Sequence, residues 1–202
     1  MVKKVQIPLD KICVKSGMLC PNCQAKIDKG LYEKWEVDVM KVLLELEDKL
    51  KGMKDVNYKK SIIFDKKLYV MLENLGQHKH EIEKYLREKL SNFGFNKIIL
   101  IEFTNNPKEL VYKLLHNIEI KSANIYYSPD GNIYYVVKVP SYEKFKVDEI
   151  GDSAKRIFKI LTNNDIYFEF VESARSTKII NEEEKLNQHI DSDKLNKILK
   201  NI

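Results

Sequence analysis

Three cysteines near the start of the chain, Cys13, Cys20 and Cys23, have the residue type and spacing of a metal-binding group. Cys20 and Cys23 form a C-P-x-C turn, in which two thiolates converge on one cation while nearby backbone N–H groups hydrogen-bond to the sulfurs. Cys13 lies upstream in the same lysine-rich segment, residues 1–30, and can add a third thiolate. The spacing therefore predicts a structural zinc site in this segment.

A tetrahedral zinc site needs a fourth ligand, and the chain contains no other cysteine. His78, His80, Asp28 or a water molecule would have to supply it. Other states of the cysteines are three reduced thiols, a disulfide that leaves one cysteine unpaired, or a redox dithiol of Cys20 and Cys23. The segment has no sustained hydrophobic period, so we expect it to become ordered through metal or through contact with the next unit.

Regular hydrophobic spacing begins at residue 31 and predicts five elements up to residue 104. A helix is predicted over 31–52, because apolar residues recur at helical spacing and Gly52 lies where a helix would stop. Two strands come next, NYKKSIIF and LYVMLENL, joined by a short turn. An amphipathic helix and a buried strand complete the set, HEIEKYLREKLSNFG and NKIILIEF.

A similar order recurs over residues 105–171. The helix NPKELVYKLLHN precedes two strands, KSANIYYS and IYYVVKV, around the hairpin turn PDGN. Two short helices, YEKFKVDEI and SAKRIFKILTN, are predicted to meet at Gly151 before the last strand, DIYFEFV. We therefore predict an α+β fold of two tandem units, 31–104 and 105–171, each a three-stranded sheet with helices on one face. Residues 172–202 are predicted to form a polar tail or a weak amphipathic helix.

This order and these residues resemble a known family. Residues 105–171 resemble the second KH domain of the NusA transcription factors, and VDEIGDSAKRI resembles its A-I-G-x-x-G-x-x-I/V signature. Residues 31–103 are more distantly similar to the preceding KH domain. The whole is similar to short archaeal NusA-like proteins with tandem KH units. The resemblance implies the type II KH fold, with a G-x-x-G loop between the second and third helices, and RNA contact during transcription elongation or termination.

The chain departs from that signature in both units. In GDSA, Ala154 stands for the second glycine and Asp152 for a usually basic residue, which places an anion where a phosphate would approach. In LGQHK, Gly76 is present but Lys79 replaces the second glycine, and the gap before the helix is too short for two helices. The alternative is structural: Gly151 ends one helix, and Asp152 or Ser153 caps the next.

The predicted RNA contacts follow from these loops. In the first unit they are Gly76, His78 and Lys79, and in the second Gly151, Ser153, Lys155 and Arg156. Four tyrosines of the hairpin strands can stack on bases, but strand alternation sends half of them into the core: Tyr126, Tyr127, Tyr134 and Tyr135.

Composition limits the class of protein. The chain has 202 residues, of which 44% are hydrophobic and 32% charged, and its net charge is +5. No apolar run approaches the roughly 20 residues that a membrane span needs, and the start lacks a secretory signal, so we expect a cytoplasmic protein without membrane contact. Catalytic motifs such as G-x-S-x-G or a P-loop are absent, so we expect no enzyme.

Two functions fit these patterns. The first is a NusA-like factor that binds single-stranded RNA through KH surfaces and the basic N-terminal segment. The second is a protein-interaction module in which the KH fold is a scaffold that docks on RNA polymerase or a ribosomal particle without gripping RNA.

Overall fold

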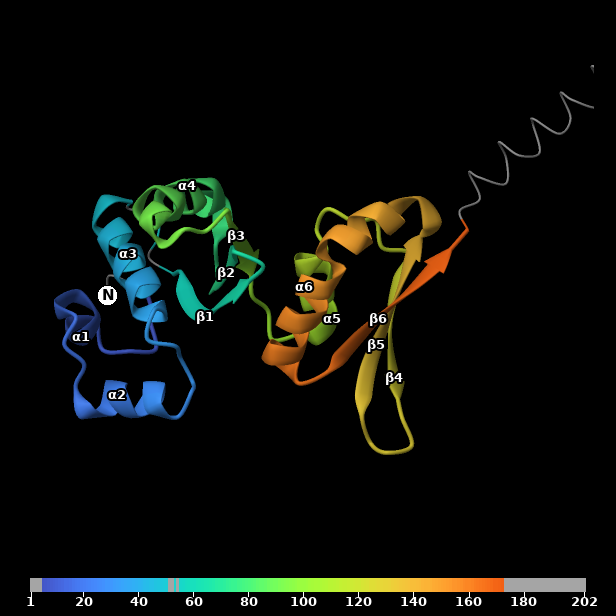
Figure 1. Ribbon diagram of the computed structural model, residues 1–202, viewed down its shortest axis with the longest axis horizontal. Coiled ribbons are helices and arrows are strands. Elements are labelled where there is room, and N and C mark those ends of the chain that lie inside the picture. The colour runs from blue at the N-terminus through green and yellow to red at the C-terminus, as the bar shows by residue number, and fades with distance from the viewer. Residues whose placement is uncertain (1–4, 51–52, 54, 173–202) are drawn as a thin grey trace, which may run out of the picture. The chain divides into compact units, whose positions relative to one another are not determined.

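The structure is a computed structural model that describes residues 5–50, 53 and 55–172. The chain divides into two compact units, Met1–Leu114 (unit 1) and Leu115–Ile202 (unit 2), which are described separately (Figure 1). This division falls after the helix of residues 107–114, whereas the boundary predicted from the sequence precedes it. The predicted C-terminal helix lies outside the described residues.

Unit 1 contains one three-stranded sheet and five α-helices among its described residues. The sheet order is β1-β2-β3, with β1 and β2 antiparallel and β2 and β3 parallel. Because parallel neighbours need a crossover, a helix must connect β2 to β3, and α4 does so. The elements are α1 (Lys11–Ser16), α2 (Pro21–Asp28), α3 (Glu36–Lys49), β1 (Asn57–Phe64), β2 (Lys67–Glu73), η1 (Gly76–His78), α4 (Lys79–Lys89), η2 (Ser91–Phe93), β3 (Lys97–Glu102) and α5 (Pro107–Leu114).

Unit 2 repeats this sheet. Its order is β4-β5-β6, with an antiparallel hairpin followed by a parallel pair. Figure 1 shows α6 lying on one side of this sheet. The predicted α+β class and the two three-stranded sheets are therefore confirmed. The elements are β4 (Ser122–Tyr127), β5 (Ile133–Pro140), η3 (Ser141–Glu143), α6 (Lys144–Thr162) and β6 (Asp165–Val171).

The N-terminal segment forms two short helices that hydrophobic periodicity does not predict. The side chain of Asp10 caps α1 by accepting hydrogen bonds from the N–H groups of Ile12, at 2.8 Å, and Cys13, at 3.3 Å. Pro21 occupies the first position of α2, where its missing N–H costs nothing. Gln6 bridges to the start of β1, because its N–H donates to Val56 O at 2.9 Å and its carbonyl accepts from Tyr58 N at 2.9 Å.

The core of unit 1 includes this N-terminal segment. Val5, Leu9 and Val14 are buried in one cluster with residues of α3, α4 and the sheet. Contact with the unit, as expected, therefore contributes to ordering the segment. Both faces of the β1–β3 sheet are buried at its centre, since β2 has five consecutive buried residues.

A buried carboxylate joins α3 to β1. Glu36, in the first turn of α3, is fully buried and accepts hydrogen bonds from Tyr58 Oη at 2.5 Å and Ser61 N at 2.7 Å. Its other oxygen accepts from Glu33 N at 2.8 Å and pairs with Lys60 Nζ at 2.9 Å. Each oxygen thus has two partners, which compensates the cost of burying the charge.

Among the described residues, no helix is both long enough and apolar enough to cross a membrane.

Candidate functional site

The three predicted metal ligands come together in the structure. Cys13 lies in α1, Cys20 immediately precedes α2 as its N-cap, and Cys23 lies in the first turn of α2. Their sulfur atoms are all within 4.8 Å of one another, and Cys13 and Cys23 are buried. All three are free thiols, so the predicted alternative of a disulfide is not formed here. Three nearby cysteines in this arrangement can hold a metal ion.

Backbone donors point at the cluster. Asp10 N–H donates to Cys23 Sγ at 3.2 Å, and Cys20 N–H donates to Cys13 Sγ at 3.4 Å. Such N–H···S bonds stabilise negative charge on sulfur, as a metal–thiolate site requires. The sequence indicates this pattern only through the C-P-x-C turn; the donor Asp10 could not be recognised from spacing.

The thiols differ in acidity. A hydrogen bond from Cys23 N–H, together with hydrogen bonds to the neighbouring thiols, lowers the pKa of Cys20. At Cys13 the N–H of Cys20 acts to lower the pKa, but burial and the two neighbouring thiols outweigh it, so the pKa of Cys13 is raised. A bound cation would favour the thiolate at all three positions.

The proposed fourth ligands are elsewhere in unit 1. The metal-binding group found among the described residues contains the three cysteines alone. The carboxylate of Asp28 accepts a hydrogen bond from Gln24 Nε2 at 2.8 Å, and His78 Nδ1 lies 2.9 Å from Glu81 Oε2. In the described part of the chain, neither Asp28 nor His78 nor His80 joins the three cysteines as a fourth ligand.

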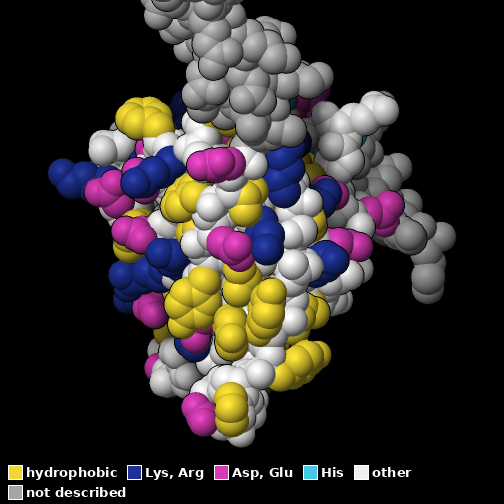
Figure 2. All heavy atoms as spheres, turned by 90° about the vertical axis from the view of Figure 1, so that its right-hand side faces the viewer, with side chains coloured by type: hydrophobic (Ala, Val, Ile, Leu, Met, Phe, Trp, Pro, Cys, Tyr) yellow, Lys and Arg dark blue, Asp and Glu magenta, His cyan; other side chains and the backbone are white. Residues whose placement is uncertain are grey.

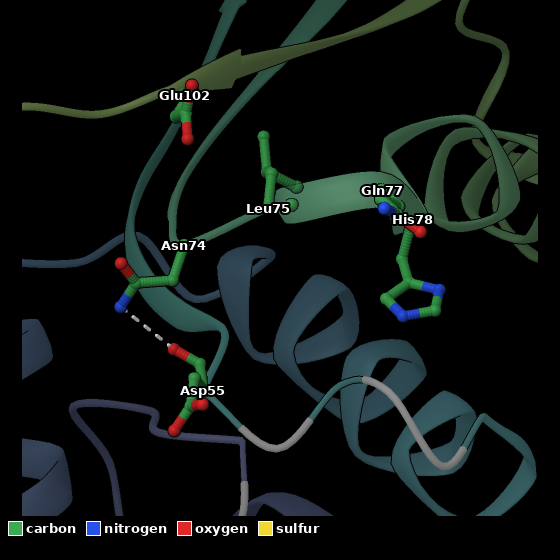
Figure 3. Close-up of a pocket in the computed structure, with 7 residues that line it drawn as sticks. Asp55, Asn74, Leu75, Gln77, His78 and Glu102 are labelled. Carbon is green, nitrogen blue, oxygen red and sulfur yellow. Dashed lines mark hydrogen bonds between the residues drawn. The ribbon is translucent and has the colours of Figure 1, made fainter.

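The glycine loop of unit 1 leads directly into one helix, as the short gap predicted. Asn74 and Gly76 adopt positive φ angles of 57° and 52°, and the short 3-10 helix η1 continues into α4 at Lys79. A pocket beside this loop also includes Asp55 and Glu102 (Figure 3). Asn74 Nδ2 donates to the carbonyl of Asp55 at 3.1 Å. Of the two carboxylates, Glu102 is ion-paired with Lys113, and Lys79, just after the loop, is exposed.

The predicted loop at Gly151 is wrong. Gly151 lies inside the continuous helix α6 and is buried against the sheet. A Cβ at this position would lie 3.1 Å from Phe168 Cε2 and 3.2 Å from Val147 Cγ1, so glycine lets α6 approach β6 closely. The proposed helix stop at Gly151 and the cap at Asp152 or Ser153 are wrong for the same reason.

The other residues of the predicted second loop also lie in α6. Ser153 is buried, and its hydroxyl donates to Ile150 O at 2.8 Å, so Gly151 and Ser153 do not form an exposed phosphate-binding loop. Lys155 and Arg156 are exposed on α6. Lys155 Nζ lies 3.7 Å from Asp152 Oδ1 and over the ring of Phe168.

Strand alternation places the hairpin tyrosines on two faces of the sheet, but the expectation that half of them lie in the core is wrong, because Tyr135 alone of the four is buried. Tyr135 is buried and packs edge-on against Phe158 of α6, with ring centroids 5.1 Å apart. Tyr126 and Tyr127 are exposed, and Tyr134 is half-buried. Tyr167 of β6, which the hairpin pattern alone does not indicate, joins Tyr126 and Tyr134 on the face away from Tyr135.

Comparison with known proteins adds little to this geometry. No family model and no curated protein matches the chain. A crystal structure of the protein APE1850 is similar to part of it, with 18% sequence identity and a TM-score of 0.41. The match covers 55% of this chain and 84% of that one. A similarity at this level carries no conclusion about fold or function.

Proposed function

We propose that this chain is an RNA-binding factor of the NusA-like type, acting in transcription elongation or termination, which contacts single-stranded RNA mainly through unit 1. The observation that carries the proposal is the uneven distribution of charge. Unit 1, residues 1–114, has 22 basic and 16 acidic residues, a net charge of +6. The described part of unit 2, residues 115–172, has 7 basic and 9 acidic residues, a net charge of −2.

The positive charge of unit 1 is available to a phosphate backbone. Exposed lysines occur on its helices, turns and strand ends, including Lys29, Lys34, Lys66, Lys79, Lys84 and Lys97. Lysine is a flexible point charge, so these side chains suit contacts with phosphates along a single strand rather than recognition of one base. The role in transcription is supported by the resemblance of residues 31–171 to the NusA-like proteins.

Charge reversal tests this proposal. We expect the double substitution Lys34→Glu, Lys79→Glu to lower the affinity for a fluorescein-labelled single-stranded RNA by roughly tenfold or more at low salt, because it adds repulsion where phosphates bind. The comparison variant is Lys155→Glu, Arg156→Glu in unit 2, with the same change in net charge. The sequence predicts these two residues as RNA contacts of a second loop, but that loop does not form within α6, so we expect a smaller loss of affinity. Fluorescence anisotropy titrations measure both. Equal losses in the two variants, or no saturable binding by the unchanged chain, would reject a unit 1 interface.

We further propose zinc as the ion of the three-cysteine cluster. A Zn–S bond of about 2.3 Å places two thiolates of a tetrahedron about 3.8 Å apart, so the sulfurs need little movement to bind one ion. The N–H···S bonds from Asp10 and Cys20 support thiolate ligands. Cys13, Cys20 and Cys23 would hold the ion, and a fourth position would be open to solvent or to a partner. Elemental analysis of the purified chain should find about one zinc per chain.

A further inference from the structure

Among the described residues of unit 2, α6 covers one face of the second sheet, and the other face carries no helix. Successive strand residues point to opposite faces, so Tyr135, Val137 and Ile166 are buried on the side of α6. The other side carries Tyr126, Tyr134 and Tyr167, which we call the tyrosine face. Figure 2 looks toward the side where β4–β6 lie and shows hydrophobic side chains gathered there.

Pairing of the three strands holds the tyrosine face together. Tyr126 and Tyr134 are direct cross-strand partners, and their rings stack nearly parallel, with centroids 5.6 Å apart and planes at 12°. Tyr167 meets Tyr134 edge-on, with centroids also 5.6 Å apart. Tyr126 is 41% exposed and Tyr167 is 55% exposed, so ring surface remains open to a ligand. In the first sheet, by contrast, Tyr69, Met71 and Ile101 are buried.

The charges beside the tyrosine face are balanced locally. Lys138 and Glu169, partners across β5 and β6, form an ion pair at 3.3 Å. Lys159 and Asp165 form another at 2.8 Å. The acidic excess of unit 2 is therefore not concentrated beside the rings. The carboxylates of β6 are both ion-paired, so the flat ring of a nucleobase can approach the tyrosines without meeting an unpaired carboxylate of β5 or β6.

Polar groups border the rings at one end. A pocket there is lined by residues of the hairpin end, by two of the tyrosines and by one ion pair: Ser128, Asn132, Ile133, Tyr134, Tyr167, Lys159 and Asp165. Hydroxyl and amide groups can hydrogen-bond to the edge of a nucleobase whose face rests on a tyrosine. Proteins bind unstacked bases with aromatic rings that stack on the base and with nearby hydrogen-bond donors and acceptors. A purely aliphatic patch lacks both kinds of contact.

We infer that the tyrosine face is a second contact surface for single-stranded RNA, one that stacks bases while unit 1 binds phosphates. This inference rests on the proposed function, because it assigns a further site to the same ligand. Each stacked base should contribute roughly five- to hundredfold in affinity. Because stacking neutralises no phosphate, it should raise affinity without changing the dependence on salt.

The test uses substitutions at the exposed rings of the full chain. We expect Tyr126→Ser, Tyr167→Ser to weaken binding of labelled single-stranded RNA about tenfold or more, with an unchanged salt slope. Tyr126→Phe, Tyr167→Phe should bind like the unchanged chain, since the rings remain. The matched control is Tyr127→Ser, which removes a tyrosine that is 73% exposed on the same strand but alternates to the other face.

A spectroscopic readout reports on base stacking itself, beside the measured affinity. RNA carrying 2-aminopurine should lose fluorescence when it binds the unchanged chain, because stacking quenches that base, and the serine variant should abolish the quenching. If the chain binds RNA and the serine variant binds equally well, the tyrosine face is not an RNA site and the proposed function stands. Loss of binding by the phenylalanine variant would contradict stacking. Absence of RNA binding by the unchanged chain would reject the proposed function itself.

Discussion

Glu36→Ala is expected to lower the free energy of unfolding by about 3–5 kcal/mol, which is typical when one member of a buried charged network is removed. The substitution leaves the buried Ser61 N–H without its acceptor and Lys60 without its ion-pair partner. Burial, and then the nearby negative charge of Glu36, hold the pKa of Tyr58 well above its ordinary value. Tyr58 is therefore a neutral donor, and it would lose its acceptor on Glu36 as well.

Urea denaturation followed by circular dichroism measures this effect. Glu36→Gln retains shape and one acceptor, so it should be less harmful, at about 1–3 kcal/mol. Glu45→Ala is the matched control on the exposed side of the same helix, and we expect a change within about 0.5 kcal/mol. A Glu36→Ala protein as stable as the Glu45→Ala protein would show that the network does not hold α3 to β1.

Cys20→Ser, or removal of zinc by a chelator, is expected to destabilise unit 1 by at least about 3 kcal/mol, because structural zinc contributes its binding energy to folding. The three cysteines join α1 to α2, and these helices share the core of unit 1 through Val14 and Cys23. The loss should be smaller than in an isolated zinc-finger peptide, since Val5, Leu9 and the Gln6 bridge still attach the segment.

The single tryptophan reports this change directly. Trp35 is partly buried against the core of unit 1 just before α3, so its fluorescence should shift at a lower temperature after chelation. Zinc affinity should also fall as the pH is lowered, because protons compete for the thiolates. Met18→Ala, at a side chain 77% exposed in the same segment, is the control. Unchanged unfolding of both the Cys20→Ser and the chelated protein would contradict a structural metal.

The spacing of hydrophobic residues along the sequence predicts most of the helices and strands. The helix predicted over residues 31–52 forms as the shorter α3, Glu36–Lys49. The strands predicted between turns form both three-stranded sheets. The predicted helix break at Gly151 is wrong, because a glycine between two amphipathic runs can also lie within one continuous helix. The spacing Val147, Gly151, Ala154, Phe158 continues one buried helical stripe without interruption, and this signal favours the single helix that forms.

Features that bring together residues far apart in the sequence could not be predicted from the sequence alone. The cysteines are close in sequence, so their spacing indicates the cluster, whereas Glu36 meets Tyr58 and Ser61 only after α3 packs on β1. The tyrosine face likewise depends on the register that brings β6 beside β5, which sequence alternation does not specify. The candidate fourth ligands Asp28, His78 and His80 lie outside the cluster, and Asp28 and His78 have polar partners elsewhere.

The salt dependence of RNA binding tests the central claim most directly. Anisotropy titrations of the full chain with single-stranded RNA, between about 50 mM and 200 mM salt, give the slope of log K against log salt concentration. If the cations of unit 1 bind phosphates, the slope should be roughly −0.7 for each phosphate neutralised, and Lys34→Glu, Lys79→Glu should make it shallower by about one to two contacts. A slope near zero, or one that this substitution leaves unchanged, would contradict RNA binding through unit 1.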